Sequence, residues 1–170
     1  FFVHADVYDA FVGRLVDGLA RLRVGDPADE GTDLGPLATA AGRDALASQV
    51  DASVALGARV LVGGHPLVGP GWFYAATALA EIPARAPVAC EEVFGPVALV
   101  WRVRDVDEAI RLANDTPYGL GSSVWTNDPR ERERFVRKLR LAEVCVEHWL
   151  TTLALPLLDD LVGAIDQHRL

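Results

Sequence analysis

The stretch Glu91-Glu92-Val93-Phe94-Gly95-Pro96-Val97 decides which fold this chain is expected to adopt. It leads into the run Val97 to Val103, which is almost entirely apolar and therefore typical of a strand covered on both faces in an α/β sheet. Gly95-Pro96 ends whatever element precedes it and directs the chain into that strand. The polar part of the stretch is thus predicted to lie on a connection at a strand end, where scaffolds usually carry their chemistry.

Two interpretations of this stretch are open from the residues alone. In the first, Glu91 and Glu92 are a solvated pair of charges, and Phe94 belongs to the hydrophobic core. In the second, one carboxylate accepts hydrogen bonds from the hydroxyls of a ligand, and the edge of Phe94 packs against a flat ring of that ligand.

The segments after the stretch alternate between apolar runs and capped amphipathic segments. Asp105 and Glu108 stand at capping-box spacing, and Asp128 precedes a proline at a first helical position. Short links in a β-α-β-α-β order predict one parallel sheet with right-handed crossovers. The expected strands and helices are 97–103, 106–113, 122–126, 129–139 and 144–146.

The segments before the stretch mix both periodicities. Helical spacing predicts a helix over Val7–Leu22 with Asp6 as its N-cap, and another over Ala40–Leu56 between Thr39 and Gly57. The second helix carries a weak apolar stripe of Leu46, Val50 and Val54. Further expected elements are strands at 1–4 and 58–62, an extended segment at 72–79, a proline-punctuated approach at 83–90 and an amphipathic helix at 153–165.

Composition excludes several classes of function. The chain has 170 residues and is 51% hydrophobic, which is enough for one core. Its net charge of −8 argues against nucleic acid or an anionic membrane surface as a partner. Two distant cysteines, Cys90 and Cys145, fit a reducing cytoplasm better than a disulfide scaffold. The sequence contains no methionine and begins with Phe1, so we expect a gene fragment, a frameshift product or a trimmed chain.

Most candidate catalytic and metal-binding residues have simpler explanations. The four histidines share no ligand spacing with one another or with the cysteines, so no metal site is predicted. Cys90 is followed by two carboxylates, which repel a thiolate, and Cys145 lies in an apolar strand and is most simply a core residue. No glycine-rich phosphate-binding motif follows a predicted strand.

The stretch at 91–97 closely resembles the Glu-Glu-x-Phe-Gly-Pro signature of the aldehyde dehydrogenase superfamily. The resemblance covers roughly residues 1–146 and implies an α/β fold, a parallel-sheet βαβ fragment of the aldehyde dehydrogenase-like fold. It divides the chain into a partial catalytic domain, 1–146, and a divergent C-terminal tail, 147–170. The other matching segments are Gly35-Pro36-Leu37, Gly57 to Gly64, Asp107 to Ile110, Ala113 to Leu120 and Val124 to Asp128.

The resemblance also implies a reaction. In this family a cysteine attacks a small aldehyde, the resulting thiohemiacetal gives a hydride to NAD or NADP, and water releases the carboxylic acid. That cysteine lies before the segment matching Phe1 to His4, so no catalytic residue is expected in this chain. Glu92 matches the carboxylate that holds the nicotinamide-side ribose, and Phe94 matches the aromatic beside the nicotinamide. These two are the predicted cofactor-binding residues.

The resemblance ends near Val146. Glu147 replaces the usual asparagine, and Leu155 to Asp160 stand where the family has a glycine-rich segment. Residues 97–128 look most like the semialdehyde-oxidising branch, whereas 144–150 look more like the aminobutyraldehyde or betaine-aldehyde branch. A homo-oligomer is expected for the full-length enzyme. The alternative is a non-catalytic remnant that acts as a structural or partner-binding module through the helix at 153–165.

Overall fold

The computed structural model describes residues 1–140 and 143–146, which form two compact units. The larger unit contains Phe1 and Val12–Trp101, and the second contains Phe2–Phe11 and the described residues from Arg102 onward. The helix α1 (Ala5–Arg21) contributes residues to both units.

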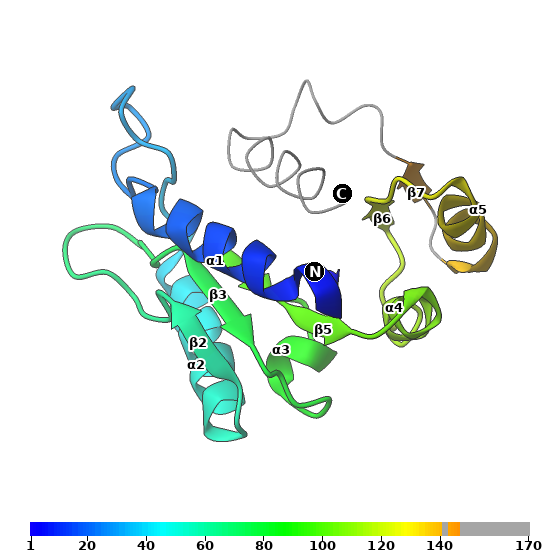
Figure 1. Ribbon diagram of the computed structural model, residues 1–170. Coiled ribbons are helices and arrows are strands. Elements are labelled where there is room, and N and C mark those ends of the chain that lie inside the picture. Colours follow the sequence, from blue (N-terminus) through cyan, green and yellow to red (C-terminus); the bar gives the residue numbers. More distant parts are fainter. Residues whose placement is uncertain (141–142, 147–170) are drawn as a thin grey trace. The chain divides into compact units, whose positions relative to one another are not determined.

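The larger unit is built on a mixed three-stranded sheet in the order β2-β3-β4. Strand β3 (Thr77–Ala80) is fully buried and lies in the middle, antiparallel to β2 (Arg59–Val62) and parallel to β4 (Val97–Leu99). Figure 1 shows α1 in front of this sheet and α2 (Ala40–Ala55) behind it. A one-turn helix, α3 (Pro87–Cys90), occupies part of the proline-punctuated approach and was not predicted.

The second unit contains the β-α-β pattern expected after residue 103. Helix α4 (Val106–Ala113) is followed by β6 (Gly121–Val124), α5 (Pro129–Lys138) and β7 (Glu143–Val146). Strands β6 and β7 pair in parallel, as predicted for a right-handed crossover. A further two-stranded sheet joins β1 (Phe2–His4) to β5 (Trp101–Val103).

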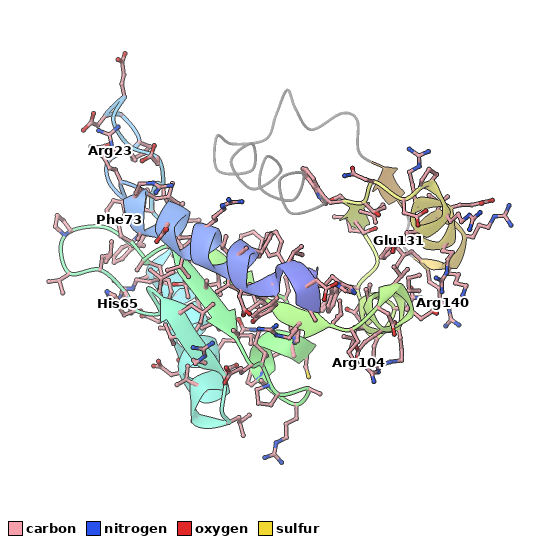
Figure 2. The ribbon with its side chains drawn as sticks, viewed as in Figure 1. Arg23, His65, Phe73, Arg104, Glu131 and Arg140 are labelled. Carbon is pink, nitrogen blue, oxygen red and sulfur yellow. The ribbon has the colours of Figure 1, made fainter. Side chains whose placement is uncertain are left out.

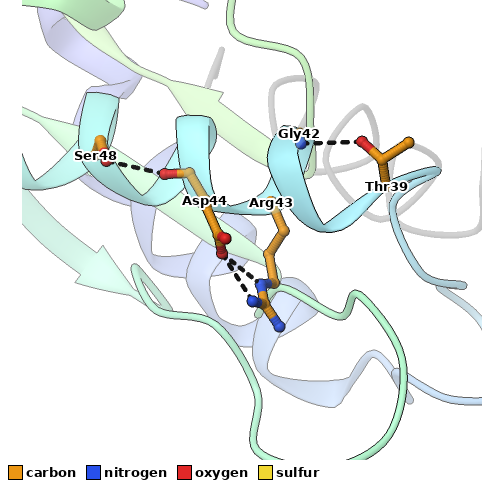
Figure 3. Close-up of polar contacts among 5 residues, drawn as sticks. All are labelled: Thr39, Gly42, Arg43, Asp44 and Ser48. Atoms are coloured by element: carbon orange, nitrogen blue, oxygen red, sulfur yellow. Dashed lines mark hydrogen bonds and ion pairs between the residues drawn. The ribbon is translucent and has the colours of Figure 1, made fainter.

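Helix ends follow the predicted capping chemistry in three places. Thr39 Oγ1 accepts from the Gly42 amide at 3.0 Å at the start of α2 (Figure 3), because the first amides of a helix lack intrahelical acceptors. The Asp105 carboxylate accepts from Glu108 N at 2.8 Å, and that of Asp128 accepts from Arg130 N at 2.7 Å. The predicted start of α1 is wrong.

Helix α1 begins before its predicted cap. Asp6 lies inside the helix, and its amide donates to His4 Nδ1 at 3.2 Å, so the histidine ring satisfies one of the first amides of the helix. The apolar stripe predicted for α2 is also partly wrong, because Val54 is exposed. Ser53 is buried in its place, since its hydroxyl bonds to backbone groups on both sides.

The strand predicted over 97–103 is two strands with different partners. The amide of buried Val100 donates to Leu79 O at 2.9 Å, and the amide of Trp101 donates to Phe1 O at 2.8 Å, so the chain changes neighbour between them. The α/β class and the parallel pairing of β6 with β7 are confirmed. The single sheet is wrong for the described residues, whose strands form three sheets with none linking β5 to β6.

Ion pairs connect α4 and α5 on the surface of the second unit. Arg134 hydrogen-bonds to Asp107 and lowers the pKa of its carboxyl group, and Lys138 adds a contact at 3.5 Å. The pKa of Glu108 is lowered by the backbone amide of Arg104 and then by its guanidinium. Figure 2 shows the side chain of Arg104 on the surface of this unit. Solvent screens such exposed pairs, so they orient the helices more than they stabilise the fold.

The core of the larger unit lies between α2, β3 and the approach to residue 91. It consists of Leu46, Val50, Ala58, Tyr74, Leu79, Ile82, Ala86 and Val88. Tyr74 is only 1% exposed, and its hydroxyl oxygen is buried without a hydrogen-bond partner. Burial, followed by the charge of Asp51, raises the pKa of Tyr74 to about 12.

Replacing Tyr74 with phenylalanine is expected to leave the free energy of unfolding unchanged or to raise it by about 1–3 kcal/mol, because an unsatisfied hydroxyl is removed. The folded-state pKa lies above the ordinary value of 10.0, so the unfolded chain loses the Tyr74 proton first as the pH rises. The free energy of unfolding is therefore unaffected by this group below pH 10 and falls as the pH rises toward 12. The variant should lack that alkaline loss. Urea midpoints across this range, with exposed Tyr118→Phe as control, test both statements; a less stable Tyr74→Phe protein at neutral pH would refute them.

Candidate functional site

The predicted site, Glu91–Val97, bridges the end of α3 and the start of β4. The Glu91 amide donates to Pro87 O at 2.9 Å and so closes α3. At the other end Pro96 O accepts from the Thr77 amide of β3 at 2.9 Å, directly before the parallel pairing of Thr77 with Val97 begins. Both ends of the connection are therefore fixed to regular structure.

Val93 is the residue in the middle of the connection that faces the core. Val93 packs against the core of the larger unit, whereas Glu92 and Phe94 on either side of it are exposed. Phe94 is 75% exposed, so the interpretation that made it a core residue is wrong. Val93 fills that core position, and the pleat of an extended chain then turns its two neighbours outward.

One face of α2 holds the connection from the side. Leu46 and Gln49 contact the connection, and Ser53, the next neighbour on the same helix surface, contacts α3 directly before it. The Gln49 amide nitrogen donates to Glu91 Oε2 at 3.1 Å and to Glu92 O at 3.3 Å. Ser53 Oγ accepts from the Val88 amide at 3.2 Å and donates to Gln49 O at 2.8 Å.

The buried Thr77 hydroxyl fixes the start of β3, the strand beside which the connection ends. It accepts from the Gly64 amide at 2.8 Å and donates to Ala75 O at 2.7 Å, so it ties β3 to the glycine turn after β2. Gly63 is required there, since its φ is +71° and an added Cβ would lie 2.3 Å from Ala76 O. Strand β3, which pairs with Val97, is therefore bonded to the turn after β2 on one side and to the connection on the other.

Gly95 allows the connection to approach α2 closely, because an added Cβ would lie 2.4 Å from Leu46 Cδ2 and 3.4 Å from its Cγ. Leu46 is buried in the core and has little room to move. Gly95→Ala is therefore expected to lower the free energy of unfolding by about 1–3 kcal/mol, the usual cost of overpacking.

Gly13→Ala is the matched control for that prediction, to be compared by urea denaturation. No atom lies within 4 Å of a Cβ added to Gly13 inside α1, so alanine should raise the free energy of unfolding by roughly 0.5–1 kcal/mol. Gly95→Ala behaving like Gly13→Ala would show that the close approach to Leu46 is not a constraint.

The chemistry available at the connection is that of an open anionic acceptor beside an exposed aromatic. Gln49 occupies one carboxylate oxygen of Glu91. Within the described residues, no hydrogen bond or ion pair occupies the Glu92 carboxylate, and only its backbone carbonyl is bonded. A carboxylate with free lone pairs can accept from two hydroxyls of a ligand, and an adjacent exposed ring can pack on a planar group.

Comparison with known proteins shows the family of the chain. The sequence profile of the aldehyde dehydrogenase family matches residues 1–156 of this chain. The chain belongs to the aldehyde dehydrogenase family. This assignment confirms the resemblance noted in the sequence.

Curated relatives of this aldehyde dehydrogenase chain include enzymes named succinate-semialdehyde dehydrogenase [NADP(+)]. The one from Mycolicibacterium paratuberculosis is 51% identical over 146 residues, covering 86% of this chain and 31% of that protein. The one from Mycobacterium tuberculosis strain H37Rv is 48% identical over 146 residues, covering 86% and 32%. The chain thus spans about a third of the length of the curated relatives it matches.

Solved aldehyde dehydrogenases share the fold. Lactaldehyde dehydrogenase from Escherichia coli has a TM-score of 0.82 at 34% identity, covering 85% of this chain and 31% of that chain. Betaine aldehyde dehydrogenase from Staphylococcus aureus, solved in complex with NAD+, has a TM-score of 0.81 at 32% identity, covering 85% and 30%.

The remaining candidate residues of the aldehyde dehydrogenase chain lie apart from the connection or beside it. Cys90 is exposed, and its thiol donates to Ala84 O at 3.3 Å. His65 makes a local contact with Gly63 O at 3.1 Å, whereas His148 and His168 lie outside the described residues, as does the expected helix at 153–165. In residues 1–140 and 143–146, no three His, Cys, Asp or Glu side chains are grouped to hold a metal ion.

The same part of the chain has no helix that is both long and apolar enough to cross a membrane.

Sequence reasoning missed Gln49 and Thr77 as partners of the connection. The signal for Gln49 was available, because it lies three residues after Leu46 on a helix whose stripe was already recognised. Thr77 gave no signal, since its role depends on contacts between distant segments.

Proposed function

We propose that this chain is the C-terminal, cofactor-facing part of the catalytic domain of an NAD(P)-dependent aldehyde dehydrogenase that oxidises an aldehyde to a carboxylic acid. The observation that carries the proposal is the exposed, unoccupied Glu92 carboxylate next to exposed Phe94, on a connection held by α2 and β3. The nicotinamide cofactor would accept the hydride. The chain's own contribution is to hold and orient the cofactor.

In this role Glu92 accepts hydrogen bonds from the hydroxyls of the nicotinamide-side ribose. Charge-assisted bonds to a carboxylate are short and directional, so they fix the ribose and, through it, the ring. Phe94 limits the ring's sideways movement by packing beside it. The combined effect is positional, because hydride transfer requires donor and acceptor atoms to be held within reach of each other.

We further propose NADP+ as cofactor and a semialdehyde as substrate. The relatives at 48–51% identity are named for succinate semialdehyde and NADP+, whereas the solved structures named for lactaldehyde and betaine aldehyde are 34% and 32% identical. The proposal treats 1–146 as part of the catalytic domain and 147–170 as a divergent tail of a homo-oligomeric enzyme. An exposed free thiol at Cys90 fits a reducing compartment, so we place the reaction in the cytoplasm.

The test is a full-length chimera in which residues 1–146 of this chain replace the matching segment of the 51% identical M. paratuberculosis enzyme. If the proposal is correct, the chimera reduces NADP+ with succinate semialdehyde at a rate within roughly tenfold of the parent. A folded chimera of parental oligomeric state that binds no NADP+ would contradict the cofactor role. Binding without turnover on any semialdehyde would contradict the proposed substrate class.

A further inference from the structure

The two adjacent glutamates of the connection are bonded differently, and Gln49 makes the difference. Its side-chain amide has two hydrogens, and both point to the connection: one to Glu91 Oε2 at 3.1 Å and one to Glu92 O at 3.3 Å. The amide orientation is fixed by these partners, because the opposite one would place the Gln49 oxygen against two acceptors.

Gln49 is itself held in place relative to the connection. It lies on α2 between two residues that grip the connection's flanks: Leu46 packs against Gly95, and Ser53 bonds to the Val88 amide. Ser53 also donates to the Gln49 carbonyl at 2.8 Å. Gln49 is half-buried, whereas its two bonds to the connection are exposed to solvent.

Two consequences follow for the carboxylates. A hydrogen bond to Glu92 O fixes the peptide plane between Glu92 and Val93, and Val93 is anchored in the core, so the direction of the Glu92 side chain is set from both ends. The bond to Glu91 Oε2 draws the neighbouring carboxylate toward α2. Glu92 is therefore the glutamate left open to a ligand.

We propose that Gln49 is a positioning residue for the cofactor: it ties Glu91 to α2 and orients Glu92 so that its carboxylate meets the ribose hydroxyls. This inference rests on the proposed function of Glu92. Gln49 does not touch the cofactor in this account. Its effect passes through Glu92 and is absent when Glu92 cannot bind the ribose.

The test uses Gln49→Met in the full-length chimera. Methionine keeps the length, volume and helix propensity of glutamine but has no hydrogen to donate. We expect the Kd for NADP+ to rise three- to tenfold and single-turnover hydride transfer to slow, with an unchanged melting temperature. Ser48→Ala, which removes a hydroxyl bonded to Asp44 O on the same helix, is the matched control and should change neither quantity.

The Glu92→Gln background separates this inference from the proposed function. If Gln49 acts through Glu92, adding Gln49→Met to Glu92→Gln causes less than a twofold further loss, since coupled residues are not additive. Equal losses in both backgrounds, or no loss in either, overturn the positioning role alone. If Glu92→Gln by itself leaves NADP+ affinity and hydride transfer unchanged, the assignment of Glu92 fails and the inference about Gln49 fails with it.

Discussion

Glu92→Gln in the full-length chimera is expected to weaken NADP+ binding by about 1.5–3 kcal/mol, or roughly 10- to 150-fold, and to slow hydride transfer. The substitution preserves size and one acceptor oxygen but removes the charge that strengthens a bond to a ribose hydroxyl. Because Glu92 is exposed and its carboxylate is unoccupied in the described chain, the change should not affect folding. Fluorescence titration and a single-turnover burst of NADPH measure the two effects separately.

Glu91→Gln is the matched control for that result. Glu91 has the same chemistry one residue earlier, but Gln49 draws its side chain toward α2, and a glutamine oxygen can still accept that bond. We expect less than a threefold change in either measurement. A larger loss from Glu91→Gln than from Glu92→Gln would mean that the two glutamates have the opposite roles.

The 170-residue chain alone is expected to produce no NADPH from any semialdehyde. It spans about a third of the length of its curated relatives, and the family resemblance leads us to expect that neither cysteine is the nucleophile. Affinity for NADP+ should be negligible as well, because a single ribose anchor cannot offset the roughly 4 kcal/mol or more of freedom lost on association. The measurement is NADPH absorbance after incubation with NAD+ or NADP+ and a panel of semialdehydes.

Cys90→Ala and Cys145→Ala variants of the isolated chain complete that experiment. Turnover that one of these substitutions abolishes and the other leaves intact would show that the nucleophile lies within this chain. Cys90 is the more informative of the two cysteines, since its thiol is exposed and lies directly before Glu91 and Glu92. Absence of turnover in the wild-type chain, together with turnover by the chimera, is the predicted result.

Local chemistry made much of the fold predictable from sequence. Caps at Thr39, Asp105 and Asp128 form as their spacing indicated, because each bond joins residues two or three positions apart. The change of partner at Val100 was not predictable. A run of apolar residues indicates a strand but carries no information on which neighbour each residue pairs with.

The sequence predicts which residues form the candidate site, a prediction that binding measurements must test, but it did not predict their geometry. Glu92 and Phe94 were identified through the signature, yet the residue pattern left the core interpretation of Phe94 open. What decides it is Val93, which takes the core position one residue earlier. Gln49 lies 42 residues before Glu91 and 43 before Glu92 in the sequence. Thr77 is likewise distant from its partner Pro96, so only folding brings the two residues to the connection.

The central claim is that the Glu92 carboxylate binds the nicotinamide-side ribose. The most direct measurement is the Kd of wild-type and Glu92→Gln chimeras for NADP+ and for an analogue that lacks both hydroxyls of that ribose. We expect Glu92→Gln to weaken NADP+ binding at least tenfold but to change binding of the analogue by less than threefold, because the analogue has already lost the contact between Glu92 and the ribose hydroxyls. Equal losses with both cofactors would contradict it.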